Sequence, residues 1–212
     1  MKIEGLKDTI EWYDQNAKAY ADSAEKVPPV ESMEQFLSML PKSPKILDAG
    51  CGPGRDSRIL SEKGATVIGL DISKGLLEEA KKRNSSRGVK YIEGDMTKME
   101  FPDASFDGVW SHASLVNLET IEDAEKAIRE YYRVLKSGGI LHILTKEQLG
   151  NEKTAIVSDP LLNHDRFFRY YTKQELGGLV SAAGFKDLDV SSIPDLHGRK
   201  EVTWILLFGK KI

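Results

Sequence analysis

A short apolar segment followed by a glycine-rich turn constrains this fold more than any other part of the sequence. Residues 45–47 have the character of a buried strand in a parallel sheet. Three glycines follow closely, Gly50, Gly52 and Gly54. Glycine allows the chain to turn sharply and lets bare backbone approach a ligand. With a helix expected from about residue 55, the stretch predicts the first half of a nucleotide-type site in an α/β protein.

Apolar strand patterns alternate with helical patterns through the middle of the chain, which favours a parallel sheet with helices on both faces. The pattern then changes, because a capping box at 172–175 begins a helix and two strands follow with a short connection, typical of an antiparallel pair. The fold class is therefore α/β, a doubly wound, seven-stranded, mostly parallel sheet with a C-terminal antiparallel hairpin. The expected strands are 45–49, 66–70, 89–93, 106–110, 140–145, 185–193 and 201–209. The expected helices are 55–63, 74–87 capped by Ser73, 121–135 capped by Thr120, and one from the capping box to near Gly184.

The N-terminal segment reads as two helices, over about 6–25 and 30–40, separated by prolines at 28 and 29. We interpret the whole chain, 1–212, as a single domain with three parts. Residues 1–43 are a helical lid, 44–146 are the ligand-binding core, and 147–212 are a substrate-side segment with the C-terminal hairpin.

Composition narrows the class of protein. The chain has 212 residues, 40% of them hydrophobic, and a formal net charge of −3, which does not suggest a general nucleic-acid binder. Cys51 is the single cysteine, so we expect no internal disulfide and no cysteine-based metal site. No apolar run approaches the roughly 20 residues of a membrane span, and no signal-peptide pattern is present. We therefore expect a cytoplasmic monomer or homodimer without a bound metal or a membrane.

Acidic residues stand at the predicted carboxyl ends of three strands, where ligands bind in open α/β sheets. Asp48 precedes the glycine turn, and a carboxylate there repels a diphosphate but suits a cationic ligand. The third glycine also comes one place earlier than in the dinucleotide pattern G-x-G-x-x-G. Asp71 can accept both hydroxyls of a ribose, and Asp95 can accept an adenine amine while the Met96 amide donates to the ring.

The pattern D-x-G-x-G-x-G over 48–54 resembles motif I of the class I S-adenosylmethionine (SAM) dependent methyltransferases, and residues 133–139 resemble that family's turn into its fifth strand. The resemblance implies a Rossmann-like fold and an enzyme that transfers a methyl group from SAM to a small-molecule O, N or C nucleophile by in-line displacement. S-adenosylhomocysteine (SAH) is then the product. By position, Gly50, Gly52 and Gly54 line the methionyl part, Cys51 contributes its backbone, and Ser111 lies near the methionyl amine. Asp71 holds the ribose, Ile72 packs on the adenine, and Asp95 with Met96 reads the adenine edge.

The methyl acceptor is not identified by the sequence, and no catalytic residue is required, since alignment and water exclusion are the main tasks. Tyr13 and Tyr20 either close over the cofactor or only pack the N-terminal helix on the core. His112, like Tyr20, is a weak candidate for a base, and its alternative is a packed or solvated histidine. Arg166, Arg169 and Tyr170 belong to a segment that is either an anion-binding and stacking wall or a set of core aromatics with solvated arginines.

Three other functions remain open at this point. The segment R-x-x-R-Y-Y with Trp204 is loosely similar to tRNA wobble-uridine methyltransferases. However, residues 164–212 carry eight Lys/Arg against six Asp/Glu, a small excess for binding phosphates. An NAD(P)-linked oxidoreductase conflicts with Asp48 and the early third glycine. A non-catalytic SAM-binding protein is the last alternative.

Overall fold

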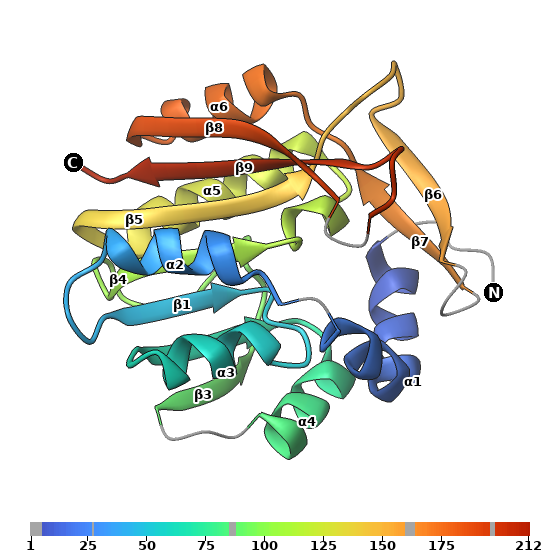
Figure 1. The fold of residues 1–212 in the computed structure, drawn as a ribbon, viewed down its shortest axis with the longest axis horizontal. Coiled ribbons are helices and arrows are strands. Elements are labelled where there is room, and N and C mark those ends of the chain that lie inside the picture. The colour runs from blue at the N-terminus through green and yellow to red at the C-terminus, as the bar shows by residue number, and fades with distance from the viewer. Residues whose placement is uncertain (1–5, 27, 85–87, 160–163, 196–197) are drawn as a thin grey trace.

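A seven-stranded sheet with the order β3-β2-β1-β4-β5-β9-β8 forms the centre of the protein (Figure 1). The structure is a computed structural model that describes residues 6–26, 28–84, 88–159, 164–195 and 198–212. Strands β1 to β5 are parallel, β9 is antiparallel to β5, and β8 is antiparallel to β9, so the predicted fold class is confirmed. The strands are β1 Lys45–Ala49, β2 Thr66–Asp71, β3 Val89–Glu93, β4 Phe106–His112, β5 Leu135–Lys146, β8 Lys186–Pro194 and β9 Thr203–Lys210.

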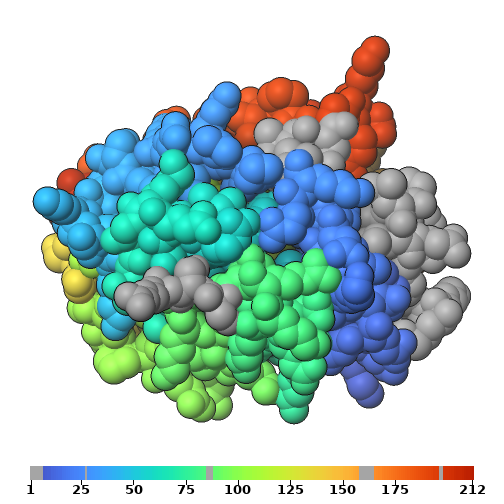
Figure 2. Space-filling view, turned by 60° about the horizontal axis from the view of Figure 1, so that its bottom comes forward, coloured from blue at the N-terminus to red at the C-terminus, as the bar shows by residue number. Residues whose placement is uncertain are grey.

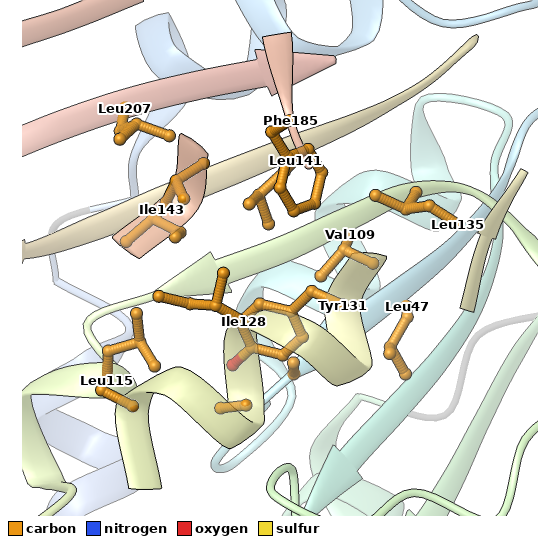
Figure 3. Packing of buried hydrophobic residues seen from close by; sticks show 14 of the residues in the cluster. Leu47, Val109, Leu115, Ile128, Tyr131, Leu135, Leu141, Ile143, Phe185 and Leu207 are labelled. Carbon is orange, nitrogen blue, oxygen red and sulfur yellow. The ribbon is translucent and has the colours of Figure 1, made fainter. Parts of the chain in front are cut away.

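The helices cover both faces of the sheet, because side chains on successive strand residues point to opposite faces. Ile46 and Trp110 belong to a cluster with residues of α2 and α3. Leu47, Val109 and Leu141 belong to the larger cluster formed with α5 and α6, part of which Figure 3 shows. The helices are α1 Leu6–Ala24, α2 Val30–Ser38, α3 Arg55–Glu62, α4 Lys74–Arg83, α5 Ile121–Val134 and α6 Lys173–Ala182, with a 3-10 turn, η1, at Leu115–Asn117.

The three predicted N-caps are present as hydrogen bonds. The Ser73 hydroxyl accepts from the Leu76 amide at 3.2 Å, the Thr120 hydroxyl from Asp123 at 3.1 Å, and the Thr172 hydroxyl from Glu175 at 3.0 Å. Each bond satisfies one of the free amides of a first helical turn. The helix expected over 74–87 ends at Arg83, and residues 85–87 lie outside the described part of the chain.

The start of β5 differs from the expectation. The strand begins at Leu135 instead of residue 140, because Leu135 pairs with Phe106 before the register shifts and Ile140 pairs with Gly108. The extra residues form a bulge that contains Gly138, whose φ of +80° lies in the left-handed region that glycine adopts without strain. The diglycine therefore lies inside an irregular strand and does not precede it.

A second, two-stranded sheet was not predicted. Strands β6 Thr154–Asp159 and β7 His164–Arg169 pair antiparallel beside α1, at the end of the molecule toward which the parallel strands point (Figure 1). The alternatives for this arginine- and aromatic-rich segment both hold in part. Phe168 and Tyr171 are buried like core residues, whereas Arg169 is only 8% exposed and is not solvated as the second alternative required.

Helix α1 lies against α4, as Figure 2 shows from below. The Asp14 carboxylate accepts from the Ser73 hydroxyl at 2.6 Å and from the Gly75 amide at 2.9 Å, so one side chain holds the start of α4. A Cβ at Gly75 would lie 2.6 Å from the Asp14 carbonyl oxygen, which explains the glycine. The helix kinks at Asn16, where φ is −117° and ψ is 18°. This docking suits the proposed lid.

Replacing Leu141 with alanine is expected to lower the free energy of unfolding by about 2–5 kcal/mol, since it removes a fully buried side chain from the larger cluster. The matched control is Leu149→Ala, because Leu149 is 62% exposed and its truncation should change stability by less than about 0.5 kcal/mol. Urea unfolding of both variants measures the difference. Equal losses would contradict the assignment of Leu141 to the core.

Candidate functional site

A cavity of about 540 Å³ opens at the carboxyl ends of the parallel strands. Residues in or directly after the carboxyl ends of β1, β2, β3, β4 and β5 line it, and α1 and β7 contribute the opposite wall. In Figure 1 the arrowheads of the parallel strands point toward α1 and the β6–β7 hairpin. This is the position at which open α/β sheets bind ligands.

The glycine turn after β1 has the conformation that glycine permits. Gly50, Gly52 and Gly54 have φ values of +77°, +52° and +84°. The amides of Gly50 and Cys51 both donate to the Leu70 carbonyl, at 2.8 and 3.0 Å, which holds the turn against the end of β2. A Cβ at Gly50 would collide with the Ser114 side chain. Gly50, Cys51 and Gly52 therefore present close-packed backbone to the cavity.

Asp71 joins this turn to the end of β2. Its carboxylate accepts from the Gly52 amide at 2.7 Å and from the Ser73 amide at 2.9 Å. Burial raises the pKa of Asp71, and these backbone hydrogen bonds offset part of that rise. Asp71 lines the cavity beside Ile72, whose side chain is 39% exposed. A carboxylate that faces a cavity can accept a pair of ligand hydroxyls.

Two further carboxylates lie on the floor of the cavity. Asp48 is 2% exposed and accepts from the Ser57 hydroxyl at 2.6 Å. Burial, followed by the charge of Asp56, raises the pKa of Asp48 to about 8. Asp56 accepts from the Arg55 guanidinium at 2.6 Å and from the Trp110 indole at 2.9 Å. Burial opposes ionisation of Asp56, but the Arg55 charge holds its pKa below the usual range.

The residues after β3 shape the next part of the wall. The Asp95 carboxylate accepts from the amide and the hydroxyl of Thr97, each at 2.8 Å, so it also closes a local turn. The Met96 sulfur accepts from the Tyr131 hydroxyl at 3.1 Å. Both Asp95 and Met96 line the cavity.

His112 ends β4 and lines the cavity from a stack of three rings. Its imidazole lies parallel to the Trp110 indole, with centroids 5.3 Å apart, and His142 stacks on Trp110 at 3.6 Å. Burial lowers the pKa of His112 to about 4, although the charge of Asp56 partly opposes this. His112 is therefore neutral near pH 7, the form that can accept a proton.

Comparison with known proteins shows to which family the chain belongs. A family model described as a methyltransferase domain matches residues 47–143. A putative methyltransferase from Encephalitozoon cuniculi is 30% identical over 178 residues, which cover 78% of each chain. The chain belongs to the class I SAM-dependent methyltransferase family.

Other similar proteins are larger or more distant. Malonyl-[acyl-carrier protein] O-methyltransferase of Enterobacter lignolyticus is 34% identical over 116 residues, which are 54% of this chain and 44% of that protein. The chain thus spans less than half the length of several curated relatives that it matches. A crystal structure of 1,6-didemethyltoxoflavin-N1-methyltransferase from Burkholderia thailandensis, with 1,6-didemethyltoxoflavin and SAH bound, superposes with a TM-score of 0.73. At 20% identity, with 97% of this chain and 86% of that chain covered, this likeness shows the fold alone.

Most site residues that the sequence analysis selected meet at this one cavity. Gly50, Gly52, Cys51, Asp48, Asp71, Ile72, Asp95, Met96, Tyr13, Tyr20, His112 and Arg166 all line it. The neighbouring Tyr13 phenol, followed by burial, raises the pKa of Tyr20, so its hydroxyl stays neutral and is poorly suited to act as a base.

Four predicted site residues are not in the lining. Gly54 caps α3, and the Tyr91 hydroxyl occupies the space beside it. Ser111 is fully buried and bonds the Ser114 hydroxyl at 2.8 Å, so Ser114 reaches the cavity in its place. Arg169 is buried behind the wall, where it donates to the Glu119 carbonyl at 3.3 Å, and Tyr170 lies outside the lining. These four residues therefore do not face the cavity in this structure.

Several residues that line the cavity were not predicted from the sequence, chiefly Arg55, Asp56, Lys146 and Trp204. Asp56 follows the glycine turn in the first turn of α3, so its position beside the turn was a usable signal. Lys146 and Trp204 are brought together by the pairing of β5 with β9, which local patterns do not reveal. Within the described ranges, no group of three or more His, Cys, Asp or Glu residues could hold a metal ion. No described helix is long and apolar enough to cross a bilayer.

The His112 imidazole is expected to titrate with a pKa of about 4. NMR of the ring protons from pH 3 to 8 would measure this, with His112→Gln assigning the signal. Because the Asp56 charge raises this pKa, Asp56→Asn should lower it further. The unfolded chain takes up a proton near pH 6.5, earlier than the folded one, so His112 should reduce stability as the pH falls from about 6.5 toward 4. A midpoint near 6.5 in the folded protein would contradict the buried, stacked arrangement.

Proposed function

We propose that this protein transfers a methyl group from SAM to a small-molecule acceptor in the cavity at the strand ends. The observation that carries the proposal is the set of acidic side chains, Asp48, Asp56 and Asp71, around a glycine turn whose backbone faces the cavity. The pKa of Asp48 is raised to about 8 by burial and by Asp56, and a bound cation favours its ionised form. SAM is a cation at its sulfonium and ammonium groups and carries no phosphate, so an acidic site suits it and disfavours a dinucleotide. When bound, SAM supplies an electrophilic methyl carbon, and transfer to a nucleophile leaves SAH.

Each part of the cavity has a proposed role in holding the cofactor. Asp71 accepts the ribose hydroxyls, since two backbone amides already fix its orientation. Ile72 offers an exposed apolar face to the adenine, and Asp95 with Met96 lies at the next strand end to meet the adenine edge. Asp48 and the backbone of residues 50–52 surround the methionyl part. The crowding around Gly50 supports this role, because any side chain there would displace Ser114.

The protein's own contribution to the reaction is alignment and exclusion of water. Tyr13 and Tyr20 of α1 pack edge to face, with centroids 4.9 Å apart, and both line the cavity. We propose that they cover the reacting groups, which makes residues 1–43 a lid on a single domain. His112 is the proposed proton acceptor where the acceptor atom carries a proton; it is neutral near pH 7, but its pKa of about 4 makes it a weak base. Because its pKa is raised, Tyr20 is proposed to position the reacting groups and to shield them from water.

The acceptor class is proposed as a small molecule because residues of α1 and β7 line the cavity opposite the strand ends and narrow the space around it. The relatives named above act on different acceptors, so no single acceptor is transferred from them. The cytoplasmic location and the oligomeric state, a monomer or a homodimer, stay predictions.

Binding to tRNA would appear as an affinity for tRNA that falls steeply as the salt concentration rises.

Ligand binding separates these functions. SAM and SAH should each raise the melting temperature, whereas NAD should not. Stabilisation by NAD alone would overturn the proposal in favour of an oxidoreductase. Transfer of a labelled methyl group from SAM to a component of a metabolite extract would then distinguish an enzyme from a protein that only binds SAM.

Asp71→Ala is expected to weaken SAH binding about tenfold to a hundredfold, because charge-assisted hydrogen bonds to the ribose are lost. Calorimetry measures the affinity, and the melting temperature shows whether the glycine turn survives. Asp189→Ala, at an exposed position of β8, is the control and should leave the affinity unchanged. Unchanged affinity in Asp71→Ala would remove Asp71 from the cofactor site.

A further inference from the structure

Two of the three acidic side chains around the glycine turn have partners that compensate a negative charge. Asp56 accepts from the Arg55 guanidinium at 2.6 Å and from the Trp110 indole at 2.9 Å. Asp71 accepts from two backbone amides, at 2.7 and 2.9 Å. Hydrogen bonds from a cation or from amides favour the ionised form of a carboxyl group.

Asp48 is the third acidic side chain, and its set of partners is weaker. It is 2% exposed, and among the described residues its side chain accepts one hydrogen bond, from the Ser57 hydroxyl at 2.6 Å. Burial penalises its charged form, the like charges of Asp56 and Asp71 add to this penalty, and Arg55 opposes it only in part, so the pKa of Asp48 is about 8. Acidic groups that are buried close together do not all ionise at once. Asp48 is therefore the group that keeps a proton near pH 7 when no cation is bound.

Three further groups that interact electrostatically with Asp48 are neutral near pH 7. They come from the glycine turn, β3 and α5, and they are Cys51, Tyr91 and Tyr131. Burial raises the pKa of each of these three side chains. The charge on Asp48 therefore depends on the charged side chains named above and on the charge of the ligand in the cavity.

The strand order places Asp48 directly beside Asp71 along the edge of the sheet. Strand β1 lies between β2 and β4, and both side chains line the cavity. In the proposed site the adenine lies at Asp95 after β3 and the ribose at Asp71 after β2. The sulfur of SAM is bonded to a ribose carbon, so it is the next group along the cofactor, and the next strand end is about 4.8 Å away. This order brings the sulfur to the end of β1, where Asp48 lies.

The sulfur is the atom at which SAM and SAH differ in charge. It is a sulfonium cation in SAM and an uncharged thioether in SAH, whereas both molecules carry the same ammonium and carboxylate groups. A cation close to a buried carboxyl group favours the ionised form, because charges interact strongly where water is scarce. An uncharged sulfur provides no such stabilisation.

Resting on the proposed function, we propose that Asp48 distinguishes SAM from SAH by losing a proton when SAM binds and regaining one once SAH has formed. The proton passes to the solvent when SAM binds and returns from the solvent after the methyl group has left, so no other reactant is needed. The ionised Asp48 attracts the sulfonium, whereas the protonated side chain has no charge with which to hold the product. Asp48 therefore favours both binding of the methyl donor and release of SAH.

Calorimetry can count this proton. Titrations at pH 7 in phosphate and in Tris, two buffers with different ionisation enthalpies, give the number of protons released per ligand bound. A group with a pKa of about 8 is largely protonated at pH 7, so SAM should release about 0.9 proton. Sinefungin, which has an aminated carbon in place of the methylated sulfur, should do the same, whereas SAH should release less than about 0.3 proton. Equal release by SAM and SAH, or no release by SAM, would overturn the proposal.

The affinities should depend on pH in the same sense. Because Asp48 must lose its proton to hold SAM, the affinity for SAM should rise about fivefold to tenfold from pH 6 to pH 7, and that for SAH less than about twofold. This range lies below the pH at which an α-amino group loses its proton and above the pKa of about 4 of His112. Parallel pH profiles for the two ligands would contradict the assignment.

Two variants link the discrimination to the named residues. Asp48→Asn should abolish proton release and weaken SAM binding about tenfold or more, while SAH affinity stays within about threefold. Asp56→Asn should reduce proton release, because the Asp56 charge raises the pKa of Asp48, and yet keep the preference for SAM over SAH. Asp189→Asn, at an exposed position of β8, is the matched control and should change neither quantity.

The outcome for Asp48→Asn is decisive only if that variant folds, which its melting temperature shows. Equal losses of SAM and SAH affinity in a folded Asp48→Asn variant would refute the proposal. If the variant does not fold, the proton counts of the unaltered protein and of Asp56→Asn decide the result, since a structural role alone would release no proton.

The same titrations separate this proposal from the proposed function. Binding of SAM and SAH without a difference in proton release would reject the role of Asp48 and leave the methyltransferase proposal intact. Failure of SAM, SAH and sinefungin to bind at all would instead reject the proposed function, and this proposal with it.

Discussion

The hydrogen bonds between the glycine turn and the end of β2 are the interaction on which the rest of the site depends. The Leu70 carbonyl accepts from Gly50 and Cys51, and the Asp71 carboxylate accepts from Gly52. These bonds close the turn at positive φ and bring two strand ends to one edge of the cavity. The same Asp71 carboxylate accepts from the Ser73 amide just before α4, and Asp14 of α1 binds the Ser73 hydroxyl. The turn, the sheet and the N-terminal helix are thereby connected through a few polar groups.

The buried ionisable groups of the cavity differ in their charge states. Arg55 and the Trp110 indole stabilise the ionised form of Asp56, while Asp48 has a raised pKa. Trp110 also supports His112, whose burial keeps the ring neutral. On the far side, Lys146 is held between aromatic rings contributed by β7 and β9.

The sequence was most informative where interactions are local. The caps at Ser73, Thr120 and Thr172 were predictable because a cap joins residues three apart. The alternation of strands and helices correctly predicted the parallel sheet. The start of β5 was predicted wrongly, because its first pairing, Leu135 with Phe106, depends on contact with β4 and is followed by a bulge. The β6–β7 pair was missed because the residues of β7 do not alternate between polar and apolar. Their pattern therefore also fits a loop.

The sequence by itself determined the acidic side of the cavity. The glycine turn with Asp48, Asp71 and Asp95 lies at strand ends whose place follows from the β/α alternation, so local patterns are sufficient. Only the tertiary structure decided the rest. It placed Ser114, and not Ser111, at the cavity, and it buried Arg169 behind the cavity wall. It also brought Lys146 next to Phe168 and Trp204. Those contacts join residues tens of positions apart, and the packing of whole strands, not the pattern within any one segment, decides which side chains meet.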